Sequence, residues 1–182
     1  LDCDEPRALT AELNVFDDEK EWFELKTKRD ISISDLDVIL MRKDPPFNKE
    51  YIYSTYILEA AKRKGVLIVN DPQSLRDCNE KIFATEFKQF TPPLIVTKNI
   101  KLLKAFLVQN EEVVYKPLDG MGGESIFKVN YKDENINVIL ETLTKFGTRT
   151  IMAQKYIADI SNGDKRILTV SYTHLRAHET LG

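Results

Sequence analysis

The sequence predicts an α/β protein with a parallel sheet, followed by a smaller α+β module. Apolar, β-branched runs at 36–42 and 66–69 flank a stretch with helical spacing, which gives the order strand, helix, strand. Beyond residue 93, short strands and helices alternate around a glycine-rich loop. Such alternation is typical of helices that cover a sheet.

The first unit begins with the strand LDVILMR at 36–42, which we expect to be buried. Asp44-Pro45-Pro46 ends it, because proline lacks the donor that a continuing strand needs. Asn48 offers a helix cap, and Lys62-Arg63-Lys64-Gly65 closes that helix with cations near its negative end. The strand VLIV at 66–69 follows, so the two strands should be parallel.

The helix of this unit shows a stripe at helical spacing, formed by Tyr53, Tyr56, Ile57 and Ala60. We expect Tyr53 and Tyr56 to belong to the core. Ligands of parallel sheets tend to bind at the carboxyl ends of the strands. The segment 42–46 lies at such an end, which makes Arg42 and Asp44 candidate ligand contacts.

From residue 79 the pattern changes. A helix through Phe83 and Phe87 is expected to lead to Thr91-Pro92-Pro93, which is typical of a hinge or linker. The module beyond it is expected to hold strands at 94–97, 112–116, 125–129 and 150–155, a helix with Leu102, Leu103, Phe106 and Leu107 on one side, and a helix over 134–145. A further strand is expected at 165–170.

The strongest local signal is KPLDGMGGES at 116–125. Its three glycines leave backbone N–H groups free to face a ligand, and Lys116 at the strand end could reach phosphate oxygens. The pattern is neither a Walker A loop nor a dinucleotide fingerprint, since both need a different spacing and a following helix. The loop alone leaves a flexible hairpin turn as an open alternative.

Composition excludes several classes. Acidic residues outnumber basic ones, 29 against 26, which gives no case for nucleic-acid binding. The apolar runs are far too short to span a bilayer, and no signal peptide is apparent. Two cysteines, Cys3 and Cys78, cannot form a disulfide framework, which favours the reducing cytoplasm. With only two histidines, a Cys/His zinc site is nearly excluded.

Five stretches closely resemble bacterial glutathione synthetases of the ATP-grasp superfamily. They are DVILMRKDPPF (37–47), NDPQSLRDCNEK (70–81), KPLDGMGGESIF (116–127), GTRTIMAQKYI (147–157) and NGDKRIL (162–168). The resemblance implies an ATP-grasp fold, α/β with an α+β lid, preceded by an incomplete Rossmann-like parallel-sheet domain. It divides the chain into part of the peptide-substrate domain (1–78), the lid (79–157), the start of the catalytic subdomain (158–170) and a tail (171–182).

The resemblance also implies an activity. Enzymes of this family use ATP to phosphorylate a carboxylate of γ-glutamylcysteine, and glycine then attacks the acyl phosphate to give glutathione, ADP and phosphate. The implied cofactors are ATP and Mg²⁺ (or Mn²⁺), with metal ligands beyond Leu168 and none assigned within this chain. The full-length protein is expected to be a cytoplasmic homotetramer without nucleic-acid or membrane partners, and the chain alone is expected to lack ligase activity.

The site residues follow from the same resemblance. It makes Lys81 and Lys116 the ATP-binding lysines. It assigns the closing phosphate loop to Gly122, Gly123 and Ser125, and the adenine frame to Gln154, Lys155, Tyr156 and Ile157. Arg166 matches an arginine near the reacting carboxylate, Asp164 could orient a lysine or ribose, and Arg42 and Asp44 match the peptide-substrate side.

Plainer interpretations of these residues stay open. Either lysine could be a solvated surface residue, Arg42 and Asp44 a local ion pair, and Tyr156 hinge packing. Two other functions also stay open: a different ATP-grasp carboxylate–amine ligase, and a non-catalytic ATP-binding module.

The last segment, SYTHLRAHETLG at 171–182, fits neither strand alternation nor an amphipathic helix. It resembles the translation of a sequencing adapter, and we expect it not to be native. It holds the histidine pair His174 and His178, which lacks a third ligand and is assigned no metal.

Overall fold

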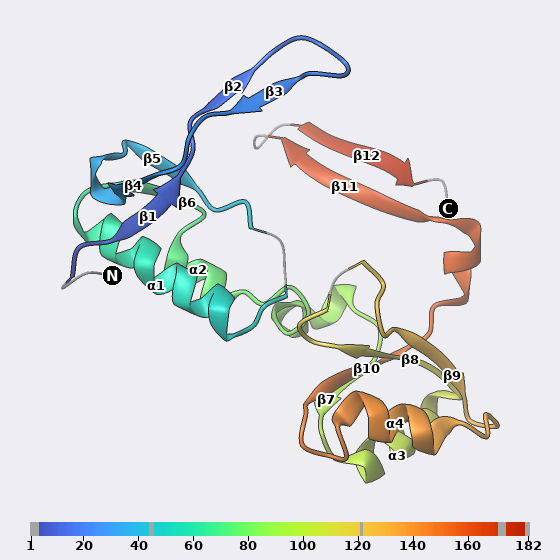
Figure 1. Ribbon diagram of the computed structural model, residues 1–182. Coiled ribbons are helices and arrows are strands. Elements are labelled where there is room, and N and C mark those ends of the chain that lie inside the picture. The colour runs from blue at the N-terminus through green and yellow to red at the C-terminus, as the bar shows by residue number, and fades with distance from the viewer. Residues whose placement is uncertain (1–3, 44–45, 121, 171–173, 181–182) are drawn as a thin grey trace. The chain divides into compact units, whose positions relative to one another are not determined.

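The computed structural model describes residues 4–43, 46–120, 122–170 and 174–180 (Figure 1). The chain divides into two compact units. The first comprises Leu1–Glu86 and Leu118–Glu124, and the second comprises Phe87–Pro117 and Ser125–Gly182. The polypeptide therefore leaves the second unit after Pro117, contributes its glycine loop to the first unit, and returns at Ser125.

The first unit starts with a ribbon of four short strands. β1 (Arg7–Thr10) pairs antiparallel with β4 (Arg29–Ser32), and β2 (Leu13–Val15) pairs antiparallel with β3 (Phe23–Leu25). A backbone hydrogen bond of 2.9 Å from Lys26 N to Glu12 O joins the two ladders. Figure 1 shows this ribbon in blue, with β2 and β3 at its far end.

The predicted strand–helix–strand unit is confirmed. After the 3₁₀ turn η1 (Ile33–Asp35), β5 (Val38–Leu40) pairs parallel with β6 (Leu67–Val69) across α1 (Lys49–Arg63), and α2 (Pro72–Asp77) follows. The side chain of Asn48 caps α1 by accepting from Tyr51 N at 3.0 Å. Gly65 ends the helix with a φ of +101°, a conformation that favours glycine.

The buried face of α1 differs from the predicted stripe. Tyr53 and Tyr56 are 53% and 49% exposed, so placing them in the core was wrong. The buried residues of α1 are Tyr51, Thr55, Leu58, Ala60 and Ala61. Several sets of positions in this helix satisfy a spacing of three and four residues, and packing against the strands selects one of them.

The two strands of this unit are also less buried than expected. Ile68 is buried, but Val38, Leu40, Leu67 and Val69 are all at least 42% exposed. The core cluster consists of Ile33, Leu58, Ala61, Val66 and Ile68. Within the described residues the sheet has two strands, and α1 supplies the buried contacts on one face. The opposite side chains of the strands therefore remain exposed.

The helix expected through Phe83 and Phe87 is replaced by two 3₁₀ turns, η2 (Phe83–Glu86) and η3 (Lys88–Phe90). The side chain of Asn79 accepts from Lys81 N at 3.1 Å and from Ile82 N at 3.0 Å, which favours a tight local turn. The prolines at 92 and 93 prevent a long helix from continuing.

The second unit is built on a four-stranded sheet in the order β7-β10-β8-β9, antiparallel throughout. Its strands are β7 (Leu94–Thr97), β8 (Glu112–Pro117), β9 (Phe127–Asn130) and β10 (Ile151–Lys155). Its helices, α3 (Ile100–Asn110) and α4 (Ile136–Thr144), lie on one side of the sheet in Figure 1. This arrangement confirms the predicted α+β module, and within the described residues of this unit the other face of the sheet carries no helix.

The core of this unit lies between the sheet and the two helices. It contains Leu103, Leu107, Val113, Tyr115, Val129, Leu140, Leu143, Ile151 and Ala153. Tyr115 is fully buried, and its hydroxyl donates to the Leu103 carbonyl at 3.0 Å. Burial raises the pKa of the Tyr115 hydroxyl to about 12.

The chain continues through η4 (Ala158–Asn162) into a hairpin of β11 (Asp164–Val170) and β12 (His174–Thr180). The sequence pattern gives no sign of a strand in the tail, so this pairing is a correction. An antiparallel ladder uses backbone donors and acceptors, which any non-proline segment can supply.

Candidate functional site

The helix-free face of the four-stranded sheet carries the first group of predicted site residues. In the ladder, Lys116 lies opposite Met152 and Gln154 lies opposite Val114. Residues opposite one another share a face, so these four side chains lie on the same side of the sheet. The alternate residues Val113, Tyr115, Ile151 and Ala153 point into the helix-covered core.

The register brings Lys116 and Gln154 together. The Lys116 Nζ donates to Gln154 Oε1 at 2.6 Å, and both side chains are half-buried. Val96 lies opposite Met152 and Leu94 opposite Gln154, so β7 extends the same face with apolar side chains. Met152 is only 2% exposed, whereas Leu94 and Val96 are half-buried. Half-buried apolar side chains beside a cation and an amide suit a ligand that has a flat apolar part and an anionic part.

The end of β10 is held by its neighbours. Lys155 N donates to the Pro93 carbonyl at 2.8 Å, and Tyr156 N donates to the Glu112 carbonyl at 3.0 Å. The Lys128 ammonium lies 3.8 Å from the centroid of the Tyr156 ring. The next residue, Ile157, is 52% exposed to solvent.

The backbone of the glycine loop adopts conformations that favour glycine, as its composition predicts. Gly122, Gly123 and Ser125 have positive φ values of 67°, 78° and 57°. Nothing lies within 4 Å of where a Cβ of Gly122 or Gly123 would be, so the surroundings of this backbone are open. Met121, between them and Gly120, lies outside the described residues.

Lys81 lies against this loop within the first unit. Its Nζ donates to the Gly120 carbonyl at 2.6 Å and to Glu80 Oε1 at 3.1 Å. The Lys81 side chain is only 15% exposed, unlike a solvated surface lysine. The Asn79 amide donates to the Leu118 carbonyl at 3.3 Å, which ties the same segment to the loop a second time.

The remaining predicted residues are less informative. Arg42 is exposed just after β5, and Asp44 lies outside the described residues. Asp164 opens β11 and is exposed, while Arg166 is described only by its backbone pairing with His178. The proposed roles of these four residues stay predictions.

Two residues near the site were not predicted. The Asn79 side chain accepts from Lys81 N and donates to the Leu118 carbonyl in the loop. Lys128 on β9 lies opposite Val114, so it shares the face of Lys116. The alternation of SIFKV could have indicated the orientation of Lys128, but its neighbours depend on the register of the sheet, which the sequence does not display.

No group of three or more His, Cys, Asp or Glu side chains in the described parts of the chain is arranged to hold a metal ion. Among the helices that the structure describes, none is long and apolar enough to cross a membrane.

Two solved structures with a similar fold are synthetases by their titles. D-cycloserine synthetase DcsG matches with a TM-score of 0.60 and 12% identity over 74% of this chain and 48% of that chain. D-alanyl-alanine synthetase A from Vibrio cholerae matches with a TM-score of 0.59 and 12% identity over 94% of this chain and 52% of that chain. At this identity the likeness shows the fold alone.

Two family models cover most of the chain. The model of the prokaryotic glutathione synthetase ATP-grasp domain matches residues 80–178, and that of the N-terminal domain matches residues 1–76. The first match reaches into the tail segment 171–182. The chain thus has an ATP-grasp fold of the α/β class. It belongs to the prokaryotic glutathione synthetase family.

Curated relatives agree with this assignment. Glutathione synthetase of Pseudomonas aeruginosa is 56% identical over 164 residues, covering 90% of this chain and 52% of the relative. That of Escherichia coli strain K12 is 57% identical over 166 residues, covering 91% of this chain and 52% of the relative. The chain therefore spans about half the length of the curated relatives it matches.

Proposed function

We propose that the protein is an ATP-dependent carboxylate–amine ligase that joins γ-glutamylcysteine and glycine into glutathione. The observation that carries the proposal is the Lys116–Gln154 pair on the helix-free sheet face, 2.6 Å apart, in a chain of the prokaryotic glutathione synthetase family. This pair offers a cation and an amide beside the apolar side chains of β7 and β10, which suits a nucleotide.

In this proposal the adenine lies against the end of β10. Backbone groups of the segment 154–157 read the edge of the base, and the ring of Tyr156, held by Lys128, borders it. Lys116 and Lys81 neutralise the phosphates, and the glycine loop offers its N–H groups to them. Lys81 would exchange the Gly120 carbonyl for a phosphate oxygen.

The chemistry proceeds through an acyl phosphate. A carboxylate oxygen of γ-glutamylcysteine attacks the γ-phosphorus of ATP, and ADP leaves. The glycine amine then attacks the activated carbonyl carbon, loses a proton, and phosphate departs. Such transfers depend on positioning and on neutralising charge. We assign Arg166 to the developing oxyanion, Asp164 to orientation, and Arg42 and Asp44 to the peptide substrate.

Magnesium enters this proposal only as the companion of ATP. The described residues do not present a set of metal ligands, so no step is assigned to the ion. We further propose that the protein works in the cytoplasm as a homo-oligomer, a tetramer when full length.

Nucleotide binding can be tested on this chain by calorimetric titration with ATP. We expect Lys116→Ala and Lys81→Ala each to weaken ATP binding by about tenfold to a hundredfold, since each removes a charge-assisted hydrogen bond. Lys101→Ala is the matched control, because Lys101 is an exposed lysine at the start of α3. Unchanged affinity in both site variants would contradict the nucleotide site.

The ligase reaction has to be measured on the complete gene product that contains this chain. Release of phosphate from ATP should require both γ-glutamylcysteine and glycine, while the 182-residue chain alone should show none. Release with another acid or amine would indicate a different ligase, and ATP binding without turnover would indicate a binding module.

A further inference from the structure

The helix-free sheet face has an aromatic ring at the end that lies away from Lys116. Tyr156 directly follows β10, and its N–H donates to the Glu112 carbonyl at 3.0 Å, so Tyr156 lies beside the first residue of β8. Glu112 and Lys116 are four positions apart on this strand, so their side chains share a face about 13 Å apart along it. The ring and the Lys116 ammonium therefore belong to opposite ends of the strand.

Lys128 contacts this ring from the neighbouring strand. It lies opposite Val114 on β9, so its side chain is on the helix-free face. The Lys128 ammonium lies 3.8 Å from the centroid of the Tyr156 ring and 3.2 Å from Glu112 Oε1. The π electrons of a ring attract a cation placed in this way. The Glu112 carboxylate thus holds the ammonium beside the ring, although the Lys128 side chain is 48% exposed.

We propose that Lys128 is a positioning residue for the base of the nucleotide, because it fixes the ring of Tyr156 against which the base packs. This inference rests on the proposed ATP site. In it, Lys128 contributes to binding of the base and Lys116 to binding of the phosphates. A larger base covers more of an aromatic ring, so the fixed ring favours a purine over a pyrimidine.

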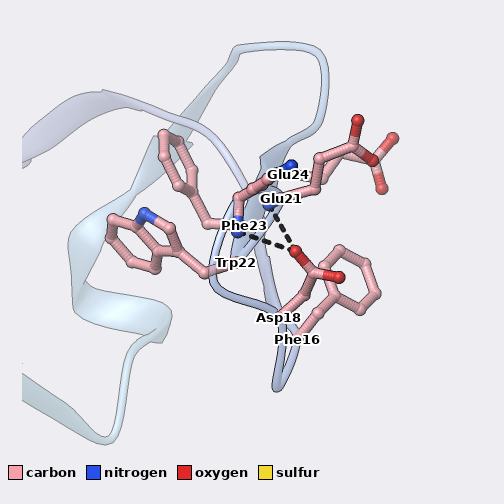
Figure 2. Close-up of a pocket in the computed structure, with 7 residues that line it drawn as sticks. Phe16, Asp18, Glu21, Trp22, Phe23 and Glu24 are labelled. Carbon is pink, nitrogen blue, oxygen red and sulfur yellow. Dashed lines mark hydrogen bonds between the residues drawn. The ribbon is translucent and has the colours of Figure 1, made fainter.

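The hairpin of β2 and β3 also presents aromatic rings. Figure 2 shows Trp22 and Phe23 on one side of this hairpin and Phe16 on the other, and these residues line an open hollow of about 640 Å³. Three carboxylates and one lysine complete its lining. Carboxylates repel phosphates, whereas the face of Tyr156 carries lysines. Trp22→Leu should therefore leave the affinity for ATP unchanged.

The proposal is tested on the full chain by calorimetric titration with ATP, CTP and inorganic triphosphate. Lys128→Met keeps an apolar stem and removes the charge. It should weaken ATP binding by about two- to fivefold and narrow the preference for ATP over CTP. Binding of triphosphate should stay as in wild type, whereas Lys116→Ala should weaken it. Lys128→Arg should restore ATP binding, since a guanidinium also packs on an aromatic ring.

A second lysine–tyrosine pair provides the matched control. The Lys132 ammonium lies 5.3 Å from the centroid of the Tyr131 ring. Tyr131 lines a hollow together with Leu107 and Val108 of α3, so this pair lies away from the helix-free face. Lys132→Met should bind ATP, CTP and triphosphate as wild type does.

Double variants test whether Lys128 acts through the ring. Tyr156→Phe keeps the ring and should bind ATP as wild type does, whereas Tyr156→Leu should bind it more weakly. Adding Lys128→Met to Tyr156→Leu should cause no further loss, because the ring on which Lys128 acts is already absent.

Equal affinity of wild type and Lys128→Met for ATP would overturn the proposal. So would a further loss of affinity in the Tyr156→Leu background. Weaker triphosphate binding by Lys128→Met would also overturn it, since Lys128 would then be a phosphate ligand. A wild type that binds neither ATP nor triphosphate would instead contradict the proposed nucleotide site, and this inference with it.

Discussion

At the residue scale, the candidate site consists of polar groups that already have partners. Lys116 is bonded to Gln154, and Lys81 is bonded to Gly120. The sequence identified both lysines as candidate site residues, because each lies in a recognisable motif. It could not show these partners, which lie 38 and 39 residues away and depend on strand register and loop path. Asn79 was missed for the same reason.

Tyr115 allows a prediction about a single buried hydroxyl. Tyr115→Phe removes the hydroxyl that donates to the Leu103 carbonyl at 3.0 Å, so the free energy of unfolding should fall by about 1 kcal/mol. Tyr131→Phe is the control, because Tyr131 is 47% exposed. Urea unfolding of both variants measures the difference, and equal values would contradict the role of the hydroxyl.

The same residue predicts a loss of stability in alkali. The pKa of Tyr115 is raised from 10.0 to about 12, so the unfolded chain loses this proton at a lower pH than the folded chain. Stability is fully present below pH 10 and declines as pH rises toward 12. Tyr115→Phe should decline less over this range in a series of unfolding curves, and parallel curves would contradict the prediction.

At the scale of elements, sequence patterns predicted which helices and strands exist better than which faces they bury. The strand–helix–strand unit and the α+β module are both present. The buried face of α1 was predicted wrongly, because more than one set of its residues satisfies helical spacing. The pair β5 and β6 was expected to be buried, yet among the described residues α1 covers only one of its faces.

The contact between α1 and α2 depends on Arg76. Its guanidinium donates to Thr55 Oγ1 at 3.0 Å and to Glu59 Oε2 at 2.6 Å, and it lies 4.8 Å from the centroid of the Tyr56 ring. The Arg76 side chain is 13% exposed. These contacts of Arg76 hold α2, the helix that precedes Asn79 and Lys81, against α1.

Arg76→Ala should therefore lower the free energy of unfolding by about 1–3 kcal/mol, because it leaves Glu59 and Thr55 without their donor. Arg76→Lys should recover only part of this loss, since an ammonium cannot reproduce the planar fork. Arg63→Ala on the exposed side of α1 is the control, with its carboxylate partner Asp4 3.8 Å away. If Arg76→Ala lowers the free energy of unfolding no more than the control does, this role of Arg76 is contradicted.

At the scale of the whole molecule, we expect the two units to differ in their response to acid. The pKa values of four carboxyl groups in the first unit are lowered. Lys64 has the largest effect on Glu5, Lys26 on Glu12, backbone N–H groups on Asp18, and Lys62 on Asp71. A lowered pKa contributes stability above the usual carboxyl value and loses it as pH falls below that value.

We therefore expect acid to open the first unit before the second. Hydrogen exchange between pH 7 and about pH 3 should show protection lost first in α1, α2 and the ribbon, and later in β8, β10 and α4. Asp71→Asn should make the protection of α2 less sensitive to pH, because it removes one of these groups. Simultaneous loss of protection in both units would contradict the expectation.

The bond between Lys81 and the Gly120 carbonyl has a consequence for how binding is measured. In the exchange proposed above, a phosphate oxygen takes the place of this carbonyl on the ammonium, so the heat released is the difference between two bonds and should be small. The exchange also removes one of the two hydrogen bonds that tie the loop to the segment 79–81. Occupancy by an anion and release of this tether would then be a single event.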